Sequence, residues 1–216
     1  MERVEYERLA ALDRRLWWFH GLHAQIIAAL HRRGPRDGGR LLDAGCGTGG
    51  LLARLAERFP RLALFGVELD AGASSVARDA SRSPICVGSV NAMPFAGGSF
   101  ATIVSADVLC HRGVDAAAAL GHFHRCLASG GLLVLNLPAY RWLLSEHDVA
   151  VDNAQRYTAG GVRRLLTSAG FTGIRTSYWN TLLFPLMVLR RKLGWRSAGK
   201  ARSEERRVGK ECRSRW

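Results

Sequence analysis

Long apolar runs, paired cysteines and lysines are scarce in this sequence. No stretch of 18 apolar residues occurs among its 216 residues, so no conventional transmembrane helix is predicted. Its first 15 residues are charged and contain no apolar signal core. The five cysteines form no Cys-x-x-Cys pair, which argues against a disulfide framework and a cysteine zinc site. We therefore expect a cytoplasmic protein with reduced thiols.

The net charge of +13 is carried almost entirely by arginine, because only three lysines are present. Such a charge is typical of nucleic-acid-binding proteins. However, no compact basic stripe interleaved with aromatic residues occurs, and arginine-rich composition with abundant Ala, Gly and Leu indicates GC-rich coding. His122 and His124 lie two residues apart on an expected helix and face different sides. We expect neither a nucleic-acid partner nor a metal site.

The last 15 residues, 202–216, differ abruptly in composition from the rest and have no apolar periodicity. They resemble the translation of a sequencing-library adapter, and the alternative is a natural disordered basic tail. The length of the remainder suits one domain. We expect a single domain over 1–201, truncated near its end. Its expected parts are a helical cap at 1–35, a core at 36–137 and an acceptor-side segment at 138–201.

Strand-like and helix-like segments alternate along the chain, which predicts an α/β fold with a parallel sheet covered by helices on both faces. The expected strands are 40–44, 63–68, 84–87, 101–106, 131–136 and 172–178. The expected helices are 5–15, 21–33, 49–58, 72–80, 115–127 and 159–168.

The most informative motif is LLDAGCGTGG at 41–50, an apolar strand followed by a glycine-rich turn. Glycines there allow the backbone to approach a ligand closely. Asp43 falls at the carboxyl end of the strand, where open α/β sheets bind ligands. The spacing also fits a dinucleotide fingerprint, with Glu68 about 20 residues on. Because Asp43 would repel a pyrophosphate and attract a cation, the motif favours S-adenosylmethionine (SAM) over NAD. An NAD(P)-dependent oxidoreductase is the alternative.

Further motifs follow in the order found in class I SAM-dependent methyltransferases, which this chain resembles over about residues 12–190. They are FGVELD at 65–70, GSVNAMPF at 88–95, SFATIVS at 99–105, VLCH at 108–111 and LASGGLLV at 127–134. The resemblance implies a Rossmann-like, doubly wound, three-layer αβα sheet. The family's last strand is antiparallel, and no strand-like run after Tyr178 supplies it, so we expect that strand to be missing.

The resemblance also implies a role for each matching residue in binding SAM. Asp43 would contact the amino group, Glu68 the ribose hydroxyls, and Ser105 and Ala106 the methionine part. Leu69 and Val90 would flank the adenine. Ser89 stands where the family usually carries an acid, and its hydroxyl accepts more weakly. The full set is Asp43, Gly45, Cys46, Gly47, Gly49, Glu68, Leu69, Ser89, Val90, Ser105 and Ala106.

LWWFHG at 16–21, SEHD at 145–148 and QRYT at 155–158 are similar to segments of a bacterial subgroup often called type 11. The resemblance implies methyl transfer but no particular acceptor, and we expect a small molecule or a lipid- or glycan-linked acceptor. The residues at Leu22 and Gln155 are usually basic in this subgroup, so acceptor recognition can differ here. A non-catalytic SAM-binding protein is a further alternative.

The catalytic side carries weaker signals. His147, beside Asp148, and His111 are the candidate general bases, because imidazole titrates near neutral pH. Trp17, Trp18 and Phe19 either cap the cleft or pack on the sheet. Residues 182–192 join an apolar run to a cationic collar, which predicts either core packing or peripheral membrane contact. The oligomeric state is open.

Overall fold

The computed structural model describes residues 16–33, 38–144, 148, 152–181, 183–186 and 188. The chain divides into two compact units. The first spans 1–109 and 114–136, and the second spans 110–113 and 137–216. The predicted helix 5–15 and the tail 202–216 lie outside the described residues.

The first unit is built on a five-stranded parallel sheet in the order β3-β2-β1-β4-β5. Its strands are β1 (Arg40–Ala44), β2 (Ala63–Glu68), β3 (Ile85–Val87), β4 (Phe100–Ala106) and β5 (Leu127–Asn136). The central strands are almost continuously buried, as strands covered on both faces should be. β5 begins earlier than the predicted residue 131, because its pairing with β4 continues to Leu127 across an irregularity in register.

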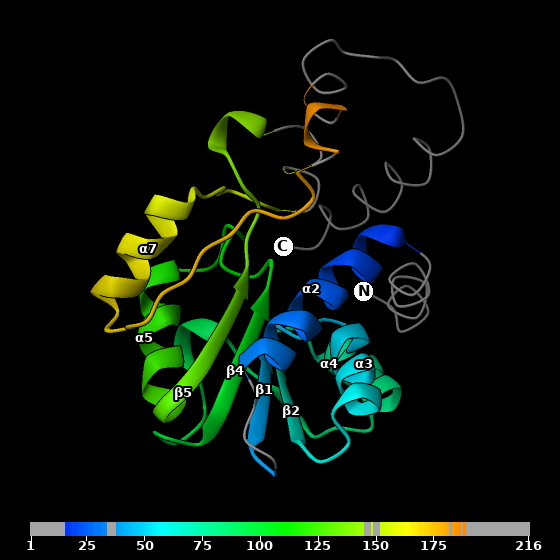
Figure 1. Ribbon diagram of the computed structural model, residues 1–216. Coiled ribbons are helices and arrows are strands. Elements are labelled where there is room, and N and C mark those ends of the chain that lie inside the picture. The colour runs from blue at the N-terminus through cyan, green and yellow to red at the C-terminus, as the bar shows by residue number, and fades with distance from the viewer. Residues whose placement is uncertain are drawn as a thin grey trace. The chain divides into compact units, whose positions relative to one another are not determined.

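The helices of the first unit are α2 (Trp17–Arg33), α3 (Gly50–Arg58), α4 (Ala71–Ser81) and α5 (Ala116–Cys126), with a short 3-10 helix η1 (Val90–Ala92). Right-handed crossovers from β1 through β2 to β3 place α3 and α4 on one face, where α2 also lies (Figure 1). The chain then runs the other way from β4 to β5, which places α5 on the opposite face. The expected three-layer αβα fold is confirmed.

Helix α2 begins at Trp17 rather than at the predicted residue 21. The predicted helix begins at Gly21. A glycine inside a helix costs only about 1 kcal/mol relative to alanine, so the helix continues through this position. Leu22, Ile26 and Leu30 compensate by burying one face of the helix. Trp17 and Trp18 are exposed on the first turn, so they do not form part of the core.

Helix α5 begins at an acid-capped turn. The side chain of Asp115 accepts hydrogen bonds from the backbone N–H groups of Ala117 and Ala118, at 2.9 and 3.1 Å. We expect Asp115→Ala to lower the free energy of unfolding by about 1 kcal/mol, because these two donors lose their acceptor. Urea denaturation followed by circular dichroism measures this change. Asp115→Asn is the control and should lie within a few tenths of a kcal/mol of the wild type.

The second unit contains a 3-10 helix η2 (Arg141–Leu143) and α7 (Ala159–Ser168). The predicted strand 172–178 is wrong, because this segment is irregular. Gly173 has a φ of +61°. The carbonyl of Ile174 accepts a hydrogen bond from the Arg163 side chain at 3.3 Å, and the Tyr178 hydroxyl accepts one from Ala159 N–H at 3.0 Å. Side-chain contacts with α7 thus take the place of strand pairing.

Of the helices that the structure describes, none has the length and apolar character needed to cross a membrane. The predicted interfacial segment 182–192 lies mostly outside the described residues.

Candidate cofactor site

The glycine loop follows β1 at the point where the order of the strands reverses. Strand β1 pairs with β2 on one side and with β4 on the other, and a ligand crevice is expected at this switch point. Gly45, Gly47 and Gly49 have φ values of +81°, +54° and +81°. The N–H groups of Gly45 and Cys46 both donate to the carbonyl of Val67, at 2.8 and 3.1 Å. The loop is therefore fixed against the end of β2.

The three glycines differ in what surrounds them. A Cβ at Gly45 would collide with the side chain of Val108, and one at Gly49 would lie 2.8 Å from the Cα of Ala77. A Cβ at Gly47 would meet nothing within 4 Å. Gly45 and Gly49 thus serve packing within the protein. Gly47 is the loop position that leaves room for a ligand to approach the backbone.

Glu68 ends β2 beside this open position. Its carboxylate accepts a hydrogen bond from Gly47 N–H at 2.9 Å through one oxygen and from Asp70 N–H at 3.1 Å through the other. Asp70 is itself fixed as the cap of α4, because its side chain accepts from Gly72 and Ala73 N–H. The Glu68 carboxylate is thus held in a defined orientation, and its remaining lone pairs can accept two further hydrogen bonds.

Asp43 is almost completely buried in β1, with 2% of its surface exposed. Burial, and secondly the negative charge of Glu68, raise the pKa of Asp43 to about 7. Burial also raises the pKa of the neighbouring Cys46 thiol, so this cysteine stays protonated near neutral pH. Two carboxylates at neighbouring strand ends create a site where a cation would be stabilised.

The predicted adenine side lies within the same unit. Ser89 caps η1, and its hydroxyl accepts a hydrogen bond from Asn91 N–H at 3.1 Å. Val90 is buried, whereas Leu69 is 56% exposed. Leu69 thus leaves an apolar surface beside a strand-end acid that a flat apolar ligand could cover.

On the β4 side of the loop, Ser105 is buried and donates a hydrogen bond to the carbonyl of Ala44 at 2.8 Å. Ala106 is half-buried. The sequence analysis missed the next residue, Asp107, which has a φ of +54° and accepts a hydrogen bond from the Asn136 side-chain amide at 2.8 Å. The available signal was a polar residue directly after β4 and another at the last position of β5.

The three candidate catalytic residues belong to the second unit, and the structure describes two of them, His111 and Asp148. His111 forms an isolated bridge with Asn153. His147 lies outside the described residues. Asp148 is buried, and its carboxylate pairs with Arg156 at 2.6 Å. Arg156 also donates to the carbonyl of Ala139 at 2.9 Å. This ion pair, whose arginine the prediction overlooked, joins three segments of the unit.

No group of three or more His, Cys, Asp or Glu residues suited to a metal ion occurs in the described part of the chain. In α2, His23 is buried and its Nδ1 has no hydrogen-bond partner. Burial, followed by the charge of Arg54, lowers its pKa to about 4, so this histidine is neutral at physiological pH.

Comparison with known proteins identifies the family. A family model described as a methyltransferase domain matches residues 18–176. Malonyl-[acyl-carrier protein] O-methyltransferase of Geobacter sulfurreducens is 27% identical over an alignment of 187 residues, which covers 79% of this chain and 67% of the relative. The enzyme of the same name from Dechloromonas aromatica is 31% identical over an alignment of 175 residues, which covers 78% of this chain and 62% of that relative. The chain thus spans about two thirds of the length of these curated relatives.

The fold recurs in solved structures. One is phosphoethanolamine N-methyltransferase 2 of Haemonchus contortus in complex with SAM, with a TM-score of 0.67 and 22% identity over 88% of this chain and 48% of that chain. Another is geranyl diphosphate C-methyltransferase of Streptomyces coelicolor, with a TM-score of 0.56 and 20% identity over 70% of this chain and 60% of that chain. Because the methyltransferase-domain model matches residues 18–176, the chain belongs to that family, whose cofactor is SAM.

Proposed function

We propose that this protein transfers the methyl group of SAM to the free carboxylate of a short acyl group held as a thioester on a carrier protein. The assignment of SAM as the methyl donor rests on the hydrogen bond from Gly47 N–H to the Glu68 carboxylate. A Cβ at Gly47 would meet nothing within 4 Å, unlike one at Gly45 or Gly49. The assignment of a carrier-bound carboxylate as the acceptor rests on two relatives, 27% and 31% identical to this chain, that are named for malonyl-[acyl-carrier protein] O-methylation.

In this proposal the strand ends hold SAM by charge and shape. Asp43 faces the cofactor's ammonium group, and Glu68 accepts hydrogen bonds from both ribose hydroxyls. Leu69 and Val90 flank the adenine, while Ser89 accepts from its amino group. The backbone of Cys46, Gly47 and Gly49 borders the ligand, and Ser105 and Ala106 line the methionine part.

Methyl transfer is an in-line displacement at carbon. The acceptor oxygen forms a bond to the methyl carbon while the carbon–sulfur bond breaks, and S-adenosylhomocysteine leaves with the electron pair. The protein contributes mainly by holding the three atoms in line. A carboxylate is already deprotonated at neutral pH. The proposed acceptor therefore needs no general base.

The absence of a required base gives a prediction for His111 and His147. We expect His111→Ala and His147→Ala to lower kcat by less than about tenfold, because removal of a true general base costs about 10²–10⁴-fold. Steady-state assays with a malonyl thioester at saturating SAM measure this. A loss of a hundredfold or more in either variant would show that a proton must be removed and would contradict a carboxylate acceptor.

The proposed acceptor is tested with SAM carrying an isotope label in its methyl group and two thioesters. We expect the label to appear as a methyl ester on a malonyl thioester, while an acetyl thioester, which has no free carboxylate, stays unlabelled. Labelling of an amine or a phenol with no labelling of the malonyl thioester would contradict the proposal.

A further inference from the structure

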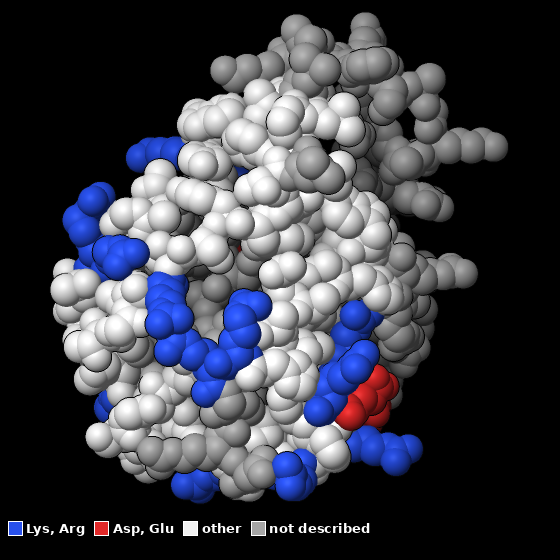
Figure 2. All heavy atoms as spheres, in the orientation of Figure 1, with Lys and Arg blue, Asp and Glu red and all other residues white. Residues whose placement is uncertain are grey.

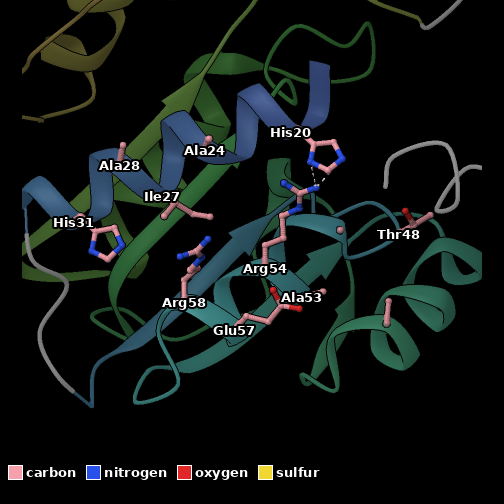
Figure 3. A pocket seen from close by; sticks show the side chains of 12 residues that line it. His20, Ala24, Ile27, Ala28, His31, Thr48, Ala53, Arg54, Glu57 and Arg58 are labelled. Atoms are coloured by element: carbon pink, nitrogen blue, oxygen red, sulfur yellow. Dashed lines mark hydrogen bonds between the residues drawn. The ribbon is translucent and has the colours of Figure 1, made fainter. Parts of the chain in front are cut away.

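A groove of about 810 Å³ runs between α2 and α3 in the first unit. Small or apolar side chains line it together with basic ones, and Arg54 and Arg58 reach from α3 toward α2 (Figure 3). The small or apolar lining residues, here called the floor, are Ala24, Ile27, Ala28, Ala53 and Ala80. None of these residues has a role in the proposed cofactor site.

The basic side chains stand in two pairs, one toward each end of the groove. His20 of α2 accepts a hydrogen bond at Nδ1 from Arg54 of α3 at 2.8 Å. His31 lies near the end of α2, on the side where Arg58 ends α3 (Figure 3). Glu57 is the acidic residue among the groove's lining. The lining therefore carries two guanidinium groups against one carboxylate, which gives the groove a small excess of positive charge. In Figure 2, acidic surface is likewise sparse among the basic side chains of the face shown.

The shape of the groove suits a helix better than a small ligand. His20 and His31 are 11 residues apart on one helix, which at 1.5 Å per residue gives a length of roughly 16 Å. Ala24, His31, Glu57, Arg58 and Ala80 are exposed, so the groove is open to solvent along its length. Enclosed pockets bury most of a small ligand, whereas an open groove with a small-residue floor accepts one face of a helix.

We propose that this groove docks an acidic amphipathic helix of the carrier protein. Aspartate and glutamate side chains of that helix would lie between Arg54 and Arg58, and its small apolar residues would contact the alanine floor. Thr48 and Gly50, which flank Gly49 of the glycine loop, also line the groove. A docked carrier would therefore lie beside the cofactor loop. The identity of the partner as the acceptor's carrier rests on the proposed function.

The test uses the full chain and a fluorescently labelled holo acyl-carrier protein without an acyl group, with binding followed by anisotropy. We expect Arg58→Glu to raise the Kd about tenfold, because a favourable charge in the groove becomes a repulsive one. Glu57→Lys, one residue away, should lower the Kd several-fold. Arg164→Glu on α7 makes the same change of charge outside the groove and should leave the Kd within twofold. Raising the salt concentration should reduce the difference between the groove variants.

Methylation of malonyl-pantetheine, which has no carrier, separates this proposal from the proposed function. We expect Arg58→Glu to leave its rate unchanged. If the small thioester is methylated and Arg58→Glu does not alter carrier binding, the groove proposal is wrong and the function stands. If the carrier binds through Arg58 but neither thioester is methylated, the groove proposal stands and the function is wrong. Binding of a single-stranded oligonucleotide through Arg58, with no carrier binding, would also overturn the groove proposal.

Discussion

Replacing Glu68 with alanine is expected to weaken SAM binding by about a hundredfold. In the proposed complex the carboxylate accepts hydrogen bonds from both ribose hydroxyls, and each bond to a charged acceptor contributes about 1.5–3 kcal/mol. The loss of two such bonds corresponds to at least two orders of magnitude in Kd. Isothermal titration calorimetry at constant pH and salt measures the change.

The same substitution removes the acceptor for Gly47 N–H and Asp70 N–H, so a change in the loop must be distinguished from the loss of ligand contacts. Glu68→Gln keeps one oxygen acceptor and a similar volume and should lose less affinity than Glu68→Ala. The Tm of each variant without SAM shows whether the fold is retained. A folded Glu68→Ala protein that binds SAM as tightly as the wild type would contradict the ribose assignment.

The affinity for SAM should rise about tenfold between pH 6 and pH 8. Without ligand, burial and the charge of Glu68 hold the pKa of Asp43 at about 7, so most molecules are protonated there at pH 6. The ammonium group of SAM requires the ionised carboxylate as its partner, so binding below this pKa releases a proton. Titrations in a series of buffers, corrected for the ionisation of SAM itself, measure the dependence.

Without SAM, raising the pH has the opposite effect: it lowers the stability of the fold instead of strengthening an interaction. The folded-state pKa of Asp43 is raised above its ordinary value of 3.8, so the protonated carboxyl stabilises the fold. That contribution is complete below the unfolded pKa and is lost as the pH rises through about 7. SAM should therefore raise the Tm more at pH 8 than at pH 6.

Asp43→Asn is the matched variant for this pH dependence. It should weaken SAM binding at pH 8 by more than tenfold and flatten the dependence on pH, because the titrating group is gone. Glu68→Gln should shift the midpoint to lower pH, because it removes the like charge beside Asp43. If Asp43→Asn binds SAM with the same dependence on pH as the wild type, another group titrates and the assignment to Asp43 is wrong.

The sequence predicted the sheet well where strands are apolar and bounded by turns. The limits of β1 and β2 agree with the prediction at both ends, and the expected parallel sheet is confirmed. The segment 172–178 has the alternation of a strand, but Arg163 and Ala159 of α7 engage its Ile174 and Tyr178. A local pattern cannot reveal that competition, because strand formation depends on a partner strand with free backbone groups.

The site was predictable to the extent that it is local in sequence. Asp43, the loop glycines and Glu68 lie at adjacent strand ends, and the hydrogen bond from Gly47 to Glu68 joins the two motifs. The contact between Asp107 and Asn136 was not foreseen, because it joins residues 29 positions apart through two strand ends. The sequence suggested His147, the preceding residue, as the partner of Asp148, whereas the carboxylate of Asp148 pairs with Arg156.

The central claim is that a carboxylate-flanked glycine loop binds SAM, and a calorimetric titration of the full chain at pH 8 tests it most directly. The account predicts one site of micromolar affinity for SAM, a strong loss of affinity in Glu68→Ala, and no heat with NAD. A folded protein that gives no heat with SAM, and binds NAD at a single site instead, would contradict it.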